Sequence, residues 1–312
     1  MARGNRAISN EFLDTLKKDD IFQKLVPVVR NDMDLCLELR DEKPALYYRG
    51  KKMFDIKLVR GKVHYIFNDS VKPKAQKIDS DVNPVNVLND LEVYKGYVNC
   101  RLQEINRQYP EGRYQYRLAH FNGICHSDDD LYCIADIEYY QENRNNWHFD
   151  LVALNSEVKS SPFFTFIEVK HGESTLRTKE GKDGNPGIRK HLFDFKKVSE
   201  KNESMLLMKK DLEKVLLQKK ELGIFQTKIN LNANCCKTEY LFVIFDYNFN
   251  SKQLRNELDD IMRNYKQLYI DCKDKTYFAF INNCDDSSQY KLSKSNFLTF
   301  EEVMQKYSSI NK

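Results

Sequence analysis

The 312-residue chain is predicted to be an α/β protein that carries a small β-rich domain at its N-terminus. Two patterns predict this. Apolar and polar residues alternate in the first 85 residues, and helical and strand patterns follow one another from residue 86 on. The composition, with 41% hydrophobic and 31% charged residues, is that of a folded chain with a core. We therefore expect a recognition or assembly domain over residues 1–85 and a second domain over residues 86–312.

The N-terminal domain is expected to consist of antiparallel strands. Alternating segments rich in β-branched and aromatic residues cover 34–40, 45–59 and 62–68. Arg49-Gly50 and Arg60-Gly61 are typical of turns between such strands. The polar segment 70–84, which contains two prolines, is the best candidate for a linker.

The second domain is expected to start with helices and then to alternate between strands and helices. Apolar residues at three- and four-residue spacing predict a helix at 87–105. Further helices are expected at 113–122, from about 188, and at 200–222, 251–266 and 297–307. Strands are predicted at 132–140, 147–155, 162–170, 238–249 and 276–283. This order predicts an α/β domain of about 225 residues.

Three charged residues on two of these strands are candidates for a metal-binding catalytic site. Asp150 lies early in the strand 147–155, and Glu168 and Lys170 end the strand 162–170. Side chains two residues apart point to the same face of a strand, so Glu168 and Lys170 share a face. Two carboxylates that meet across a hairpin would bind Mg²⁺ through oxygen ligands. A nearby lysine could orient or deprotonate the attacking water.

The sequence Phe149-Asp150 … Glu168-Val169-Lys170, with its flanking helices, resembles the PD-(D/E)xK nuclease superfamily over roughly residues 86–285. Phe149 stands where the name-giving proline would be. The resemblance implies a restriction-endonuclease-like core, a mixed central sheet flanked by helices. It also implies a Mg²⁺-dependent nuclease, with Mn²⁺ as a possible substitute, that hydrolyses phosphodiester bonds. An endonuclease acting on DNA rather than RNA is favoured, in prokaryotic defence, restriction or repair.

The resemblance implies further site residues. The family has an acid on the helix before the sheet, for which Glu111 is preferred to Glu104 by a small margin. A polar or basic residue often lies on the helix after the third strand, and Arg189, Lys190 and His191 are the matching positions. They would contact the scissile phosphate or the attacking water.

Each of these residues also has a purely structural interpretation, and for Arg189, Lys190 and His191 it is an ordinary solvated helix face. Asp150 could end strand pairing, and Glu168 with Lys170 could form a surface ion pair of little energetic value. Glu111 could be a first-turn acid that stabilises its helix. At the level of function, the alternatives are a catalytically silent nuclease fold that binds nucleic acid or assembles with protein, and an interaction protein built on residues 1–85. Besides nucleic acid, the expected partners are a second copy of this chain in a homo-oligomer or a defence-system partner protein.

The net charge of +4 conceals a local asymmetry. Residues 86–142 hold 10 acidic and 5 basic residues, whereas residues 168–228 hold 10 acidic and 15 basic residues. In the nuclease interpretation, the basic segment would bind along the phosphates of the nucleic acid, and this binding would weaken as the salt concentration rises. The chain has no apolar segment typical of a signal peptide or a membrane span, and no Cys-x-x-Cys pair. We expect a cytoplasmic protein without membrane contact.

Overall fold

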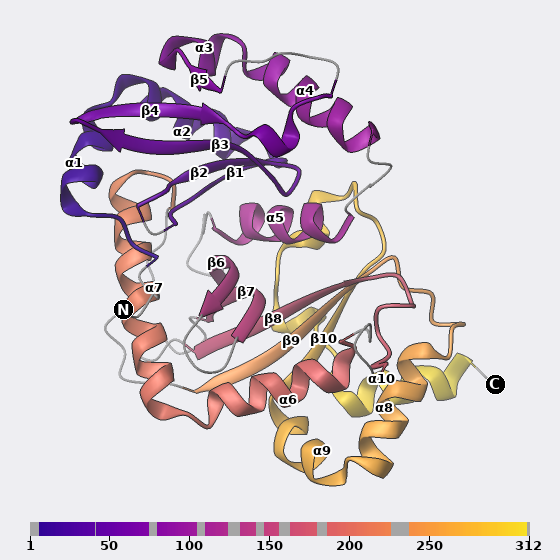
Figure 1. Cartoon of the computed structure of the whole chain (residues 1–312). Coiled ribbons are helices and arrows are strands. Elements are labelled where there is room, and N and C mark those ends of the chain that lie inside the picture. Colours follow the sequence, from indigo (N-terminus) through magenta and orange to yellow (C-terminus); the bar gives the residue numbers. More distant parts are fainter. Residues whose placement is uncertain are drawn as a thin grey trace. The chain divides into compact units, whose positions relative to one another are not determined.

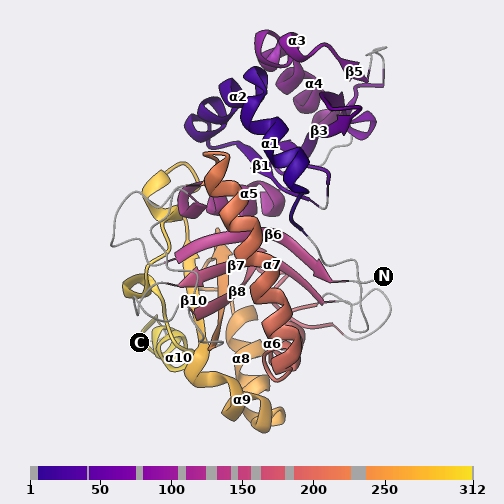
Figure 2. The same cartoon turned by 90° about the vertical axis from the view of Figure 1, so that its left-hand side faces the viewer.

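The computed structural model describes residues 6–40, 42–74, 80–104, 110–123, 132–141, 147–155, 163–179, 186–225 and 237–310. They form a mixed α/β structure with two five-stranded sheets (Figures 1 and 2). The chain divides into two compact units, which are described one at a time. The first contains residues 1–126, 142–144 and 209–228, and the second contains residues 127–141, 145–208 and 229–312.

The first unit is built on an antiparallel sheet with the strand order β1-β2-β3-β4-β5. The strands are β1 (Leu35–Glu38), β2 (Ala45–Tyr48), β3 (Lys51–Val59), β4 (Lys62–Phe67) and β5 (Asp81–Val82). The first four match the predicted strands. The fifth lies in the predicted linker, where Val82 pairs with Tyr65 of β4.

Helices also make up much of the first unit, in contrast to the β-rich prediction for residues 1–85. They are α1 (Asn10–Lys18), α2 (Asp20–Asn31), α3 (Pro84–Asn89), α4 (Leu91–Glu104), α5 (Pro110–Gly123) and the second part of α7 (Asn202–Glu221). Caps define where α1 and α2 begin, because Ser9 accepts a hydrogen bond from the Phe12 amide and Asp19 accepts one from the Phe22 amide. The first unit extends past the predicted domain boundary at residue 85, because α4 and α5 also pack against strands of its sheet.

The two predicted hairpin turns are present. Arg49 and Gly50 have φ values of 50° and 74°, and Arg60 and Gly61 have the same values, as a two-residue type I′ turn requires. At Gly50 a Cβ atom would lie 2.7 Å from the backbone carbon of Gly112 in α5. Only glycine therefore allows this turn to approach the start of α5.

The second unit contains the sheet β10-β9-β8-β7-β6 (Figures 1 and 2). Its strands are β6 (Tyr132–Gln141), β7 (Trp147–Asn155), β8 (Phe163–His171), β9 (Thr238–Phe245) and β10 (Thr276–Ile281). Its helices are α6 (Ile188–Ser199), the first part of α7, α8 (Gln253–Asn264), α9 (Lys266–Cys272) and α10 (Phe300–Ile310). All five strands were predicted, whereas the helix expected at 251–266 is followed by a separate helix, α9.

Strand direction divides this sheet into two parts. β6, β7 and β8 are antiparallel neighbours, whereas β8, β9 and β10 run parallel. Parallel strands need long crossover connections, which α6 with α7 and α8 with α9 supply. Helix α6 packs on β9, and the ring of its Phe195 contacts Phe166, Tyr240 and Phe242 of the sheet. An aromatic layer thus fixes α6 against the face of β8 that carries the even-numbered side chains.

Two further findings concern possible membrane spans and disulfides in the part of the chain that the structure describes. Among the helices that the structure describes, none has the length and apolar character needed to span a membrane. No disulfide joins the cysteines in the described ranges, which are Cys36, Cys100, Cys133, Cys272 and Cys284.

Candidate metal and active site

Asp150 lies where the pairing between β7 and β8 ends. The antiparallel register runs from Asn155 opposite Phe163 to Leu151 opposite Ile167. One residue beyond it, Oδ2 of Asp150 accepts a hydrogen bond of 2.8 Å from the amide of Val169. The Asp150 side chain therefore binds the backbone of β8 at this point, and the residue is only 6% exposed.

Glu168 and Lys170 lie on the same face of β8, as the alternation predicted. Both are buried, with 3% and 5% of their surface exposed. Beside them Phe166 stacks on Phe149, with ring centroids 4.4 Å apart. The interpretation of Glu168 and Lys170 as a surface ion pair is therefore wrong, because the pair lies in an aromatic environment away from solvent.

Two side-chain nitrogens contact one oxygen of Glu168. The Lys170 ammonium donates to Oε1 at 2.6 Å, and Nε2 of His191 on α6 lies 3.0 Å from the same oxygen. The Lys170 and His191 nitrogens are 3.3 Å apart. Burial alone would raise the pKa of Glu168, but the charges and hydrogen bonds of His191 and Lys170 lower it to about 2. Glu168 is thus held as a carboxylate.

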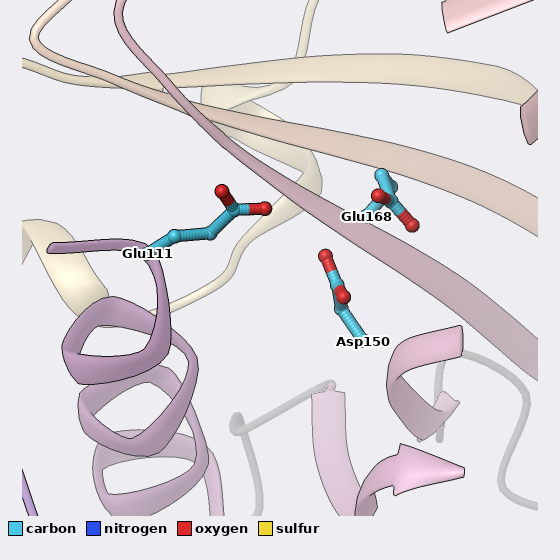
Figure 3. A group of neighbouring side chains, drawn as sticks. All are labelled: Glu111, Asp150 and Glu168. Atoms are coloured by element: carbon cyan, nitrogen blue, oxygen red, sulfur yellow. The ribbon is translucent and has the colours of Figure 1, made fainter. Parts of the chain in front are cut away.

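The second oxygen of Glu168 differs from the first in its hydrogen bonding. Oε2 is buried and has no hydrogen-bond partner among the described residues. A buried carboxylate oxygen without a partner is expensive unless a ligand engages it. Carboxylate oxygens of Asp150 and Glu168 approach within 4.8 Å of one another, and Figure 3 shows the two side chains together. This donor set, all oxygen and doubly charged, fits a hard divalent cation such as Mg²⁺.

The two candidates for the helix acid both belong to the first unit. Glu104, at the end of α4, accepts from the Lys74 amide at 3.1 Å and pairs with Arg101 at 2.9 Å, so local contacts already engage both of its oxygens. Glu111 lies in the first turn of α5, and Figure 3 draws it with Asp150 and Glu168. That Glu111 holds a metal ion together with Asp150 and Glu168 of the second unit stays a prediction.

The three predicted phosphate-contacting residues of α6 have different surroundings. Arg189 is 9% exposed; it donates to Asp260 at 2.9 Å and stacks on the Tyr265 ring at 4.3 Å. Lys190 is exposed and pairs with Asp194 one turn further along α6. His191 faces Glu168 as described above. A contact of any of these side chains with nucleic acid stays a prediction.

Comparisons with protein-family models, with curated proteins and with solved structures found no match. The functional argument therefore depends on the residues themselves.

Proposed function

We propose that this chain is a Mg²⁺-dependent cytoplasmic nuclease that cleaves DNA. The observation that carries the proposal is the buried Oε2 of Glu168, which has no hydrogen-bond partner among the described residues, in a carboxylate that approaches the Asp150 carboxylate within 4.8 Å. A structural ion pair between Glu168 and Lys170 has no need of a second carboxylate nearby, whereas a metal site does. The choice of DNA, and of a role in prokaryotic defence, restriction or repair, comes from the resemblance to PD-(D/E)xK nucleases.

Each residue has a distinct task in this proposal. Asp150 and Oε2 of Glu168 would hold the ion, and the Val169 amide fixes Asp150 for that purpose. A bound Mg²⁺ would act as a Lewis acid on the scissile phosphate and lower the pKa of its water. Lys170 would orient that water or stabilise the charge that develops on phosphorus. Lys170 and His191 together keep Oε1 of Glu168 engaged, so that Oε2 is the oxygen left for the ion.

Cleavage of plasmid DNA tests the proposal. We expect the wild-type chain to cut supercoiled plasmid with Mg²⁺ and to be inactive in EDTA. Asp150→Asn keeps the shape of the side chain but removes its charge, so the rate should fall at least about 100-fold. Asp274→Asn is the matched control, because Asp274 is an exposed acid of the same unit; its rate should stay at the wild-type value.

Two results would reject the nuclease assignment. One is cleavage by Asp150→Asn at the wild-type rate. The other is salt-dependent DNA binding by the wild-type chain without cleavage under any divalent ion, which is what a catalytically silent fold would give. An RNA of equal length in parallel reactions decides between the two substrates.

A further inference from the structure

In the first unit, three arginines converge on one carboxylate. Asp34, immediately before β1, accepts from Arg49 of the β2–β3 turn at 3.1 Å. It also accepts from Arg113 at 3.2 Å to each oxygen, and from Arg117 at 2.9 Å. Arg113 and Arg117 belong to α5, so the cluster links the sheet to that helix.

The cluster has more positive than negative charge. Three guanidinium groups face a single carboxylate, which leaves two positive charges among these four side chains. Burial alone would raise the pKa of Asp34, but hydrogen bonds from Arg117 and Arg113 lower it below its ordinary value. Asp34 is therefore already ionised and cannot supply further negative charge.

The three arginines are not equivalent. The Arg117 side chain is 3% exposed and joins α5 to Asp34 at 2.9 Å. Arg49 and Arg113 have side chains that are 37% and 35% exposed. A purely structural link would not require these two additional, solvent-accessible cations beside the buried one.

Both of these partly exposed arginines are oriented by their existing contacts, and each has a terminal nitrogen left to donate further hydrogen bonds. Arg49 uses Nε on Asp34 and Nη1 on Asn99 at 3.0 Å. Arg113 uses Nε and Nη2 on Asp34. One terminal nitrogen of each, Nη2 of Arg49 and Nη1 of Arg113, has no hydrogen bond to a described residue. Guanidinium groups held in this way are suited to an oxyanion that accepts several hydrogen bonds, above all a phosphate.

We propose that Arg49 and Arg113 form a phosphate-binding site of the first unit, which contacts the backbone of duplex DNA. The anion site follows from the charges and exposure of the cluster alone, whereas DNA as its source rests on the proposed function. A backbone contact of this kind fixes position on the duplex without reading sequence. It assigns substrate binding to the N-terminal part of the chain.

The test is DNA binding by the full chain in EDTA, where no metal-dependent cleavage occurs. The anisotropy of a labelled 20-bp duplex is measured with Arg49→Ala and with Arg113→Ala over a range of KCl concentrations. Each variant should weaken binding about tenfold and equally for unrelated sequences. The slope of log affinity against log salt should fall by about 0.9 for a lost phosphate contact. Arg→Lys at the same positions, which keeps the charge, should retain most of the slope.

Lys52→Ala is the matched control. Its side chain is also 37% exposed and in the same sheet, but it has its own acid, Asp55, at 2.8 Å. Its affinity and slope should equal those of the wild-type chain. Circular dichroism melting identifies any variant that fails to fold, and the Arg→Lys variant at that position then provides the comparison.

The outcomes separate this site from the nuclease activity. Wild-type affinity and slope in both Arg49→Ala and Arg113→Ala would overturn the site, whatever the cleavage assay gives. Absence of duplex binding by the wild-type chain would overturn it as well, and binding of single-stranded RNA in place of duplex DNA would overturn DNA as the occupant. If the wild-type chain binds but never cleaves, and both variants lose affinity, the site stands and the proposed function fails.

Discussion

Lys170→Ala is expected to abolish cleavage without abolishing metal binding. The Lys170 ammonium donates to Oε1 of Glu168 and not to Oε2, so its removal takes no ligand from the ion. What is lost is the group that acts on the attacking water or on the developing charge, and such groups contribute about 10²- to 10⁴-fold in rate. We expect at least a 100-fold slower cleavage at saturating Mg²⁺, while the Kd for Mn²⁺, measured by calorimetry, stays within about threefold of the wild-type value.

Two comparison variants make this result specific. Lys196→Ala removes a lysine of α6 that is held by Glu200 at 2.9 Å and by Asp271 at 3.1 Å, and it should leave both rate and Kd unchanged. Asp150→Asn should raise the Kd at least tenfold. If Lys170→Ala cleaved DNA as fast as the wild-type chain, Lys170 would have no catalytic role and its contact with Glu168 would be structural.

The second prediction with a large expected effect concerns how the stability of the folded chain changes at acid pH. The pKa of Glu168 in the folded chain is about 2, against an ordinary value of 4.5. Because the folded value is the lower one, Glu168 stabilises the folded state above pH 4.5, and this stabilisation is lost as the pH falls toward 2. The difference corresponds to about 3 kcal/mol at pH 7. Glu168→Gln should therefore be less stable than the wild-type chain at pH 7, and this gap should narrow by about 2 kcal/mol between pH 7 and pH 3.

Urea unfolding in EDTA, followed by circular dichroism from pH 7 to pH 3, measures this gap. Glu302→Gln serves as the control. Contacts with the Thr299 backbone and hydroxyl lower the pKa of Glu302, but its carboxylate is exposed, so a much smaller change with pH is expected. Parallel curves for the wild-type chain and Glu168→Gln would show that the contacts of Glu168 with Lys170 and His191 do not stabilise the fold.

The sequence was sufficient for those features that depend on local pattern. β-Rich segments predicted the strands that are β6, β7 and β8, and the alternation of side chains along a strand predicted the shared face of Glu168 and Lys170. The helices α1 and α2 lie outside the β-rich prediction for residues 1–85, although the sequence carries signals for them. Ser9 and Asp19 are typical caps, and the apolar residues that follow each of them recur at helical spacing.

Features that join distant segments could not be read from the sequence. Arg113 and Arg117 stand one helical turn apart and indicate a basic face, but Asp34 lies 79 and 83 residues before them. Only the packing of α5 on β1 brings these groups together. The same is true of His191, whose contact with Glu168 depends on the aromatic packing that positions α6.

The most direct measurement of the central claim is the anomalous signal of Mn²⁺ in crystals of the wild-type chain. We predict one strong peak about 2.1 Å from an oxygen of Asp150 and from Oε2 of Glu168, and we predict that it disappears in Asp150→Asn. A Mn²⁺ ion bound elsewhere, with neither of these carboxylates as a ligand, would contradict the account.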